Sequence, residues 1–281
     1  MNSFARYATY PMWKLPRQVT ILIALVLLAA CGSRSTAGGV NISGSTSVSP
    51  FVEHLAEIFK REHAGTLINV QSLGSSAGIQ AAIEGTANIG MSSRDLSEEE
   101  AAQLDQLIIA RDALAVIVHP SNPLTGLSLA QIQAIFSGEI TSWKELGGPD
   151  QAITLIVREA GSGTYGAFDE LVMKGKRIST AALRQGSNGA IRQLVSLDPN
   201  AIGYISLGIV DATVKALPID TVQPSVEHVE DGTYSFVRPF LFVWPKGQTP
   251  APEAARFIDY VMSDVGQEEV LRLGLVPAAD E

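Results

Sequence analysis

Two long apolar segments, residues 107–118 and 235–244, constrain the fold of this 281-residue chain more than any other feature. Each is long enough and apolar enough to form a strand that is buried on both faces. Around them, shorter apolar runs alternate with stretches whose apolar residues recur at helical spacing. This alternation predicts an α/β fold in which helices cover both faces of the sheets.

The long strands also predict how the chain is divided. They bracket its middle third, so we expect the chain to leave one lobe on the first strand and to return on the second. Two connections between two lobes predict a hinge with a cleft between them. The expected lobes are residues 40–117 plus 240–281 and residues 118–239. The other strands are expected at 40–43, 67–71, 87–91, 153–157 and 201–205, and the helices at 50–62, 78–84, 98–104, 129–136, 166–173, 190–196 and 253–262, with a short one that ends at 273.

Residues 1–30 have the pattern of a secretory signal peptide. Three basic residues and no acidic residue precede an apolar run at 19–30, whose 12 residues are too few to span about 30 Å of hydrocarbon as a helix. The run ends in Leu28-Ala-Ala-Cys-Gly32, which resembles the bacterial lipobox. That resemblance implies that Cys31, the only cysteine, becomes an N-terminus carrying lipid chains such as palmitate. Residues 31–39 are rich in Ser and Gly and predict a flexible tether.

We therefore expect a mature protein outside the cytoplasm, anchored by lipid to a bacterial membrane in the periplasm or at the cell surface. Its net charge of −9 becomes −12 once the three basic residues of the signal peptide are removed. Nucleic-acid-binding proteins normally carry a basic face, and aromatic residues, at 6%, are too few for a base-stacking platform. One cysteine excludes an intrachain disulfide, and the four histidines lack the spacing of a metal pair. Neither a metal nor a cofactor is expected.

Four loops rich in Gly, Ser, Thr and Asn lead into predicted helices without supplying an acidic residue. A helix start leaves about four backbone N–H groups unpaired and carries roughly half a positive charge, which Asp or Glu usually offsets. Helix starts without acids favour a site for an external anion. Arg158, just before the third loop, could bind an oxyanion through two hydrogen bonds. Taken singly, each loop could be an ordinary N-cap, and Arg158 an ion-pair partner of Glu159. The loops are Gly44–Pro50, Gly74–Gly78, Gly161–Gly166 and Gly186–Gly189.

Motifs for nucleotide binding and serine hydrolysis do not fit. Residues 161–166 match G-x-G-x-x-G after a strand, but residues 178–186 supply neither the second strand nor the acidic residue of a dinucleotide fold. The P-loop motif is absent, and a serine hydrolase would need a partnered histidine. The histidines fall on the polar face of a predicted helix or in turns, so none is expected to act as a catalytic base. They are His54, His63, His119 and His228.

Six segments resemble the phosphate-binding proteins of bacterial high-affinity phosphate ABC transporters, in the shorter branch of that family. The resemblance covers residues 40–280 and implies a two-lobed periplasmic-binding-protein fold of type II. Each lobe would be a mixed sheet flanked by helices, with two hinge strands between them. Such a protein closes on phosphate and delivers it to a membrane permease; we expect a monomer that performs no catalysis. The segments are Gly44–Pro50, Gly74–Ile79, Ile89–Leu96, Ile135–Gly148, Val157–Thr164 and Pro199–Tyr204.

Carried over position by position, the resemblance implies the ligand-binding residues. Ser93 stands where longer members have an aspartate that accepts the ligand's proton. Phosphate carries a proton near neutral pH whereas sulfate does not, so an acceptor must come from elsewhere, and Asp95 and Glu159 are the nearest candidates. The implied contacts are Thr46, Ser47, Ser75 and Ser93 from the first lobe and Arg158, Ser162, Gly163 and Thr164 from the second.

The sequence thus predicts an extracytoplasmic lipoprotein that binds inorganic phosphate for an ABC permease. One alternative keeps the fold but binds or senses another tetrahedral oxyanion, such as sulfate or molybdate. A second alternative is an enzyme, for instance a phosphatase or a serine hydrolase, that uses one of the hydroxyl groups. A third is an envelope lipoprotein whose loops are only helix caps.

Overall fold

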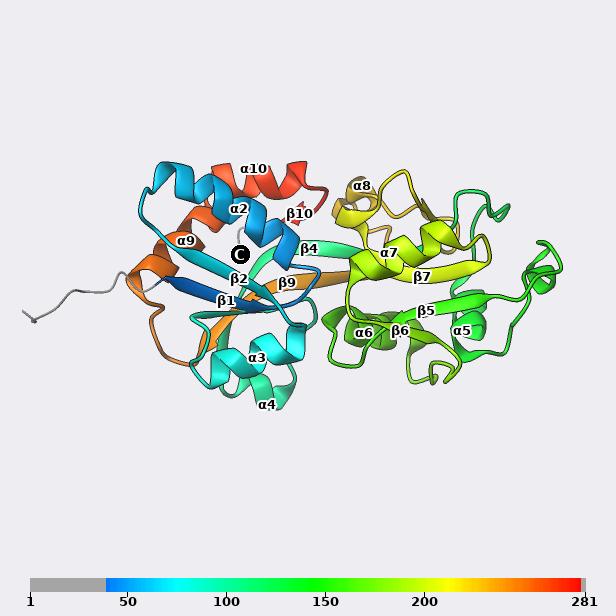
Figure 1. Ribbon diagram of the computed structural model, residues 1–281, viewed down its shortest axis with the longest axis horizontal. Coiled ribbons are helices and arrows are strands. Elements are labelled where there is room, and N and C mark those ends of the chain that lie inside the picture. Colours follow the sequence, from blue (N-terminus) through cyan, green and yellow to red (C-terminus); the bar gives the residue numbers. More distant parts are fainter. Residues whose placement is uncertain (1–38, 279–281) are drawn as a thin grey trace, which may run out of the picture. The chain divides into compact units, whose positions relative to one another are not determined.

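The computed structural model describes residues 39–278 (Figure 1). The predicted signal peptide, Cys31 and all but the last residue of the predicted tether lie outside the described residues. No helix between residues 39 and 278 is long and apolar enough to cross a membrane.

Five strands form the sheet of the first lobe. In order across the sheet they are β2 (Ile68–Ser72), β1 (Val40–Gly44), β3 (Ile89–Ser92), β9 (Val237–Pro245) and β4 (Leu104–Val118). β1 runs parallel to β2 and β3, whereas β9 runs antiparallel to β3 and β4. A short strand, β10 (Val276–Pro277), also pairs with β4. The sheet is therefore mixed, as predicted.

The sheet continues into a second lobe because β4 is long enough to serve both. Residues 114–118 of β4 pair antiparallel with β7 (Ala201–Ser206). β7 runs parallel to β5 (Thr154–Arg158), which in turn runs parallel to β6 (Leu183–Gln185). β8 (Lys215–Ala216) pairs with the end of β4. Every residue of β4 from 112 to 118 is buried, which is what a strand covered on both faces requires.

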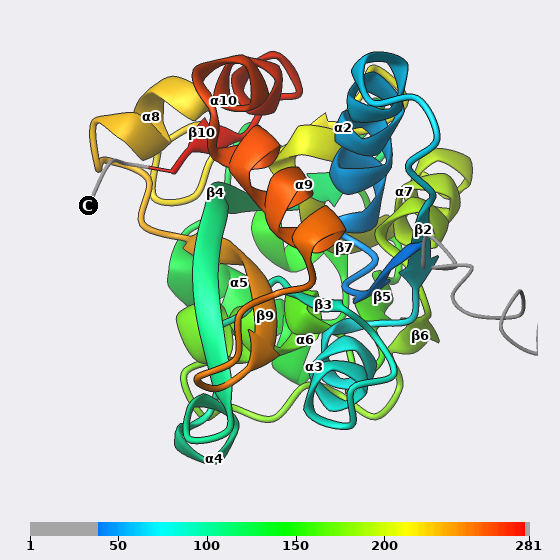
Figure 2. The same ribbon diagram turned by 90° about the vertical axis from the view of Figure 1, so that its left-hand side faces the viewer.

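Helices cover both faces of the first-lobe sheet (Figure 2). α2 (Ser49–Glu62), α9 (Pro252–Met262) and α10 (Asp264–Arg272) lie on one face, and α3 (Ser75–Ile83) and α4 (Glu98–Ala101) lie on the other. α2 buries Phe51, Leu55 and Phe59, which recur at helical spacing. The ring of Phe51 contacts Phe240 of β9, and that of Phe59 contacts Phe257 of α9. The amphipathic pattern of the sequence thus becomes a packed aromatic core.

The second lobe also has a packed aromatic core. The rings of Phe168 and Tyr204 stack with their centroids 3.7 Å apart, and Phe136 meets both edge-on. Ile191 and Val195 pack with Ile117 on the other face of the sheet. The helices are α5 (Leu129–Ser137), η1 (Trp143–Leu146), α6 (Gly163–Phe168), the π-helix η2 (Asp169–Met173), α7 (Asn188–Leu197), η3 (Leu207–Ile209) and α8 (Val226–Glu230).

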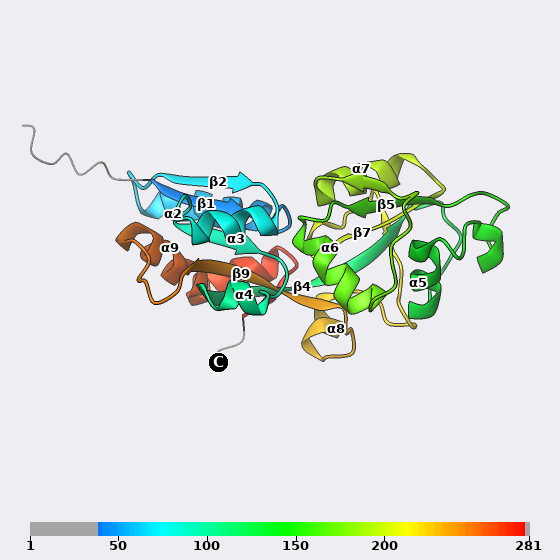
Figure 3. The ribbon, with the colours of Figure 1, turned by 90° about the horizontal axis from the view of Figure 1, so that it is seen from below.

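The hydrophobic core divides along the two long strands. On β4, Ala110 belongs to the first-lobe core and Ala113 to the second-lobe core. Around the beginning of β9 the order is reversed, since Phe236 belongs to the second-lobe core and Phe240 to the first-lobe core. Figures 1 and 3 show β4 and β9 running side by side between the two groups of elements. The predicted α/β fold with two lobes and two hinge strands is confirmed. The predicted lobe boundaries after residues 117 and 239 remain predictions.

Several predicted elements differ from the structure at their ends. α3, α6 and α7 begin at Ser75, Gly163 and Asn188, inside the glycine- and serine-rich loops and two or three residues earlier than predicted. The helix predicted at 98–104 ends at Ala101 because the buried Leu104 already begins β4. The segment 178–186 was predicted without a strand, which is wrong, since β6 lies there. β6 has only three residues, two of them exposed, so it lacks the apolar pattern by which strands are recognised.

Gly78 sets the distance between α3 and β1. A Cβ atom built at Gly78 would lie 2.4 Å from both the Cα atom of Gly44 and the carbonyl oxygen of Ser43. We expect Gly78→Ala to lower the free energy of unfolding by about 1–3 kcal/mol, because the helix must move away from the strand. Urea unfolding followed by circular dichroism measures the change. Gln80→Ala, an exposed change on the same helix, should cost less than about 0.5 kcal/mol. Equal effects of the two substitutions would contradict the contact.

Candidate functional site

The four predicted anion-binding loops lie at helix starts, as the sequence indicated. None of the helices α2, α3, α6 and α7 has an acidic residue in its first turn. The hydroxyl groups of Ser162 and Ser187 accept hydrogen bonds from backbone N–H groups at the starts of α6 and α7. α2 and α3 have no side-chain cap. Just before α2, however, the hydroxyl of Ser45 accepts from the backbone N–H groups of Ser47 and Val48 over 3.2 and 3.4 Å, so only the start of α3 has no side-chain acceptor.

Hydroxyl groups from the two lobes meet directly. The Oγ atom of Ser47, at the start of α2, lies 2.7 Å from the Oγ1 atom of Thr164 in α6. The side-chain nitrogen of Asn188, at the start of α7, donates to Ser47 over 2.6 Å and to Thr164 over 3.4 Å. All three residues are buried. Asn188 lies in the fourth loop, but the sequence analysis did not single it out.

The first-lobe serines form a second buried group beside this contact. Ser75 Oγ accepts a hydrogen bond from the backbone N–H of Ser93 over 3.1 Å, and Ser93 Oγ accepts one from Ser45 Oγ over 2.8 Å. A Cβ atom at Gly163 would lie 2.2 Å from Ser75 Oγ and 2.5 Å from Ser93 Oγ. The start of α6 therefore fits against these serines only because residue 163 has no side chain. The structure brings five predicted site residues together: Ser47, Ser75, Ser93, Gly163 and Thr164.

Arg158 brings a positive charge to the same place. It is fully buried at the end of β5, and its backbone N–H donates to the hydroxyl of Tyr204 over 3.3 Å. Its guanidinium donates to the carbonyl groups of Gln185 and Gly186 and, over 3.4 Å, to Thr164 Oγ1. Among the described residues it makes no ion pair, Glu159 included.

Burial, with a smaller contribution from the charge of Arg238, lowers the pKa of Arg158 to about 10. The guanidinium therefore stays charged at neutral pH. Burying this charge costs free energy, which a bound anion would offset.

A second buried arginine, Arg238 on β9, was missed by the sequence analysis. Its Nε and Nη2 atoms donate to the carboxylate of Asp112 on β4 over 3.0 and 2.8 Å. Nη2 also reaches Ser47 Oγ at 3.2 Å, and Nη1 reaches the carbonyl oxygen of Ser93 at 3.3 Å. Asp112 also accepts a 2.8 Å hydrogen bond from Ser206. The available signal was the charge inside the two long apolar segments, Arg111 and Asp112 in the first and Arg238 in the second.

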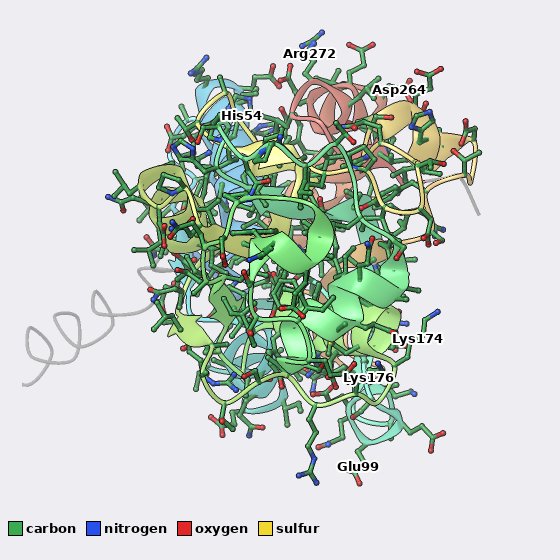
Figure 4. All side chains as sticks on the ribbon, turned by 90° about the vertical axis from the view of Figure 1, so that its right-hand side faces the viewer. His54, Glu99, Lys174, Lys176, Asp264 and Arg272 are labelled. Atoms are coloured by element: carbon green, nitrogen blue, oxygen red, sulfur yellow. The ribbon has the colours of Figure 1, made fainter. Side chains whose placement is uncertain are left out.

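The buried charges sum to one positive charge. Within residues 39–278, the charged residues that are buried are Asp112, Arg158 and Arg238. Burial raises the pKa of Asp112, whereas Arg238 and Ser206 act in the opposite direction. Because Arg238 donates two hydrogen bonds to it, we assign Asp112 as ionised. The other charged side chains lie nearer the surface, as Figure 4 shows for Lys174, Lys176 and Arg272.

The remaining predicted residues are placed differently. Thr46 Oγ1 is buried and has no hydrogen-bond partner. Ser162 Oγ accepts from the N–H groups of Thr164 and Tyr165 over 3.1 and 3.3 Å, so it caps α6. Asp95 and Glu159, the predicted proton acceptors, are both exposed and lie outside the buried group.

The histidines have other partners. His54 pairs with Glu269, His63 stacks on Phe59, and the ring of His119 forms a hydrogen bond with Ser121 in a turn. His228, which was expected in a turn, lies in α8, where its ring forms a hydrogen bond with the carbonyl oxygen of Gln223. Between residues 39 and 278, no cluster of three His, Cys, Asp or Glu side chains could hold a metal ion.

Breaking the Asp112–Arg238 pair should be costly. We expect Asp112→Asn to lower the free energy of unfolding by about 3–5 kcal/mol, because Arg238 is left as an unpaired buried charge. A double variant, Asp112→Leu with Arg238→Met, should recover part of that loss, since no charge remains buried. Urea unfolding measures all three proteins. Asp150→Asn, which breaks the exposed pair with Lys144, is the matched control and should change little. A loss in Asp112→Asn no larger than in this control would contradict the inferred pair.

Comparison with known proteins places the chain in a family. Residues 29–265 match the PBP superfamily domain. The chain is 30% identical over 275 residues to the phosphate-binding protein PstS of Borreliella burgdorferi, covering 92% of this chain and 98% of that protein. It is 32% identical to PstS of Bacillus subtilis over 257 residues, covering 90% of this chain and 85% of the other.

Solved structures agree with this placement. A putative phosphate ABC transporter substrate-binding protein from Clostridium perfringens, solved with bound phosphate, is 42% identical and superposes with a TM-score of 0.83 over 86% of this chain and all of the other. An ABC-type phosphate transport receptor from Vibrio cholerae is 36% identical with a TM-score of 0.72, over 85% of this chain and 100% of the other. The prediction of a type II periplasmic-binding-protein fold is confirmed. The chain belongs to the PBP superfamily and, within it, to the PstS family of phosphate-binding proteins.

Proposed function

We propose that this protein binds inorganic phosphate between its two lobes, outside the cytoplasm, and delivers it to an ABC permease. The observation that carries the proposal is Arg158, a buried guanidinium without a carboxylate partner among the described residues. It lies within hydrogen-bond distance of Thr164, whose hydroxyl meets Ser47 of the other lobe. The names of the relatives and the phosphate-bound structure from C. perfringens favour phosphate over sulfate or molybdate as the ligand.

The binding group would combine charge with many short-range donors. Arg158 and Arg238 supply guanidinium N–H groups, which form strong hydrogen bonds to phosphate oxygens. The hydroxyl and backbone N–H groups at the helix starts supply neutral donors that approach closely because of the glycines. The first lobe would contribute Thr46, Ser47, Ser75 and Ser93, and the second Arg158, Ser162, Gly163 and Thr164. Donors from both lobes would hold the lobes closed on the ligand and release it when they separate.

We propose binding without bond chemistry. The hydroxyl groups of Ser47 and Thr164 face arginine and amide N–H groups, which are donors and cannot take up a proton. Asp112 is occupied by Arg238 and Ser206, and the histidines among residues 39–278 have other partners. A hydroxyl without a base is a poor nucleophile. We propose that the protein works as a monomer whose partners are phosphate and the permease.

Removing the charge of Arg158 should abolish tight binding. We expect Arg158→Met to raise the Kd for phosphate about 100-fold or more, because several charge-assisted hydrogen bonds are lost in a buried place. Isothermal titration calorimetry with phosphate measures the Kd. Arg61→Met, which removes an exposed arginine of α2, should leave it unchanged. Unchanged affinity in Arg158→Met, or no binding of phosphate by the wild-type protein, would contradict the proposal.

We further propose that Cys31 is lipidated and anchors the protein to a membrane. The proposal rests on the segment Leu28–Gly32 and on the signal-peptide pattern before it. The sequence after Cys31, rich in Ser and Gly, would give the lobes free movement relative to the anchor.

Replacing the cysteine should release the protein. In a bacterial host grown with labelled palmitate, we expect Cys31→Ser to carry no label and to partition into the aqueous phase of a detergent extraction. Wild-type protein should carry the label and enter the detergent phase. Ser33→Ala, two residues further on, should behave as the wild type. Labelling of Cys31→Ser equal to that of the wild type would show that lipid is attached elsewhere.

A further inference from the structure

A phosphate site needs an acceptor as well as donors. Near neutral pH phosphate keeps at least one proton, so one of its oxygens acts as a hydrogen-bond donor, whereas sulfate has only acceptor oxygens. A buried donor without a partner weakens binding, because desolvation of that group is not compensated. The residue that accepts this proton therefore decides how strongly the site prefers phosphate to sulfate.

The carboxylates between residues 39 and 278 do not provide a free acceptor at the interlobe contact. Asp95 and Glu159 are exposed. Asp112 is buried, but one of its oxygens accepts two hydrogen bonds from Arg238 and the other accepts one from Ser206. Three of its about four acceptor positions are therefore taken, and breaking the Arg238 pair would leave an unpaired charge inside the protein.

The hydroxyl groups are also occupied as acceptors. Ser47 Oγ receives N–H groups from Asn188 and Arg238 at 2.6 and 3.2 Å, which fills both of its lone pairs. Thr164 Oγ1 receives N–H groups from Arg158 and Asn188, each at 3.4 Å. Ser93 Oγ receives the hydroxyl of Ser45 at 2.8 Å and Arg238 at 3.4 Å. One of the hydroxyl groups of Ser47 and Thr164 also donates to the other over 2.7 Å, so these groups have little capacity left to accept.

Asn188 is different because one end of its amide is unused. Its nitrogen links Ser47 and Thr164, the two residues through which the lobes meet. Its oxygen, Oδ1, is buried and has no hydrogen-bond partner, and the residue is only 1% exposed. The amide nitrogen fixes the orientation of the side chain, so the carbonyl oxygen is held beside the same hydroxyl groups. An amide oxygen has two lone pairs and no proton, so it can only accept.

Among the described residues, the other buried side-chain atoms without a hydrogen-bond partner are less suited to this role. Ser43 Oγ belongs to β1, and Tyr260 OH belongs to α9. Thr46 Oγ1 lies in the first anion-binding loop, but its hydroxyl can either donate or accept and so serves any tetrahedral oxyanion, whereas an amide oxygen can only accept.

On the basis of the proposed function, we propose that the side-chain carbonyl of Asn188 accepts the hydrogen bond of the protonated phosphate oxygen and thereby sets the preference for phosphate over unprotonated oxyanions. The contact is electrically neutral, unlike a carboxylate. It adds no negative charge beside Arg158 and Arg238, so the single buried positive charge stays available to the ligand.

The test compares three ligands of similar shape. Phosphate carries the proton, whereas sulfate and monofluorophosphate are tetrahedral dianions without it. Calorimetry on the full chain gives the Kd of each, and the quantity of interest is the ratio of the sulfate or monofluorophosphate Kd to the phosphate Kd. We expect Asn188→Leu, similar in size but without an acceptor, to lower this ratio about 10-fold or more. Asn188→Asp, which keeps an acceptor oxygen at the same place, should hold the ratio at or above the wild-type value.

A matched control separates the acceptor from a general loss of affinity. Thr46→Val removes the other unpartnered atom of the loops, and it should weaken the three ligands alike and leave the ratio unchanged. An unchanged ratio in Asn188→Leu, while the wild type binds phosphate, would overturn the role of Asn188 and leave the proposed function intact. If Asn188→Leu does not fold, Asn188→Asp decides, and a 10-fold fall of its ratio overturns the inference. Failure of the wild type to bind phosphate would instead contradict the proposed function.

Discussion

The ion pair between Arg238 and Asp112 joins the two strands that run between the lobes, at the point where the hydrophobic core divides. Replacing a buried pair of this kind by apolar residues often costs little stability, so its value here is positional. The carboxylate holds the guanidinium with two hydrogen bonds, and the remaining N–H groups of Arg238 point at Ser47 and Ser93. One side chain therefore belongs both to the hinge and to the loops that form the interlobe contact. A change in the relative position of β4 and β9 would therefore move the N–H groups of Arg238 within that contact.

The distribution of charge separates the surface from the interior. The chain carries a net charge of −9, yet the buried residues Arg158, Arg238 and Asp112 sum to one positive charge. At physiological salt the Debye length is about 8 Å, so the exposed acids contribute little to the field around a buried anion. Affinity for an oxyanion would come from contacts of hydrogen-bond length in a place that excludes water, where each interaction is stronger than at the surface.

The sequence was a good guide to local structure and a poor guide to long-range pairing. The spacing of the apolar residues and the turn-forming residues predicted the strands and helices. The absence of acidic residues at four helix starts indicated the loops that meet between the lobes. The starts of α3, α6 and α7 were predicted two or three residues late because Ser and Gly favour caps and loops as well as first turns. Asp112 and Arg238 are 126 residues apart. A charged residue inside a long apolar segment indicates a buried charge, but its partner is not identified until the register of β4 and β9 is known. Asn188 was missed for a related reason, because an asparagine in a loop is usually a turn residue.

Gly163 contributes to the interlobe contact through its lack of a side chain and not through a hydrogen bond. The helix start that bears it lies against Ser75 and Ser93 so closely that even a methyl group would collide with both hydroxyl oxygens. The missing side chain therefore permits the close approach of the two lobes at this point. Closer approach leaves less solvent around whatever is enclosed, so this one position governs how completely a captured ion is dehydrated. It also adjusts the balance between closed and open populations, and with it the readiness with which cargo is given up.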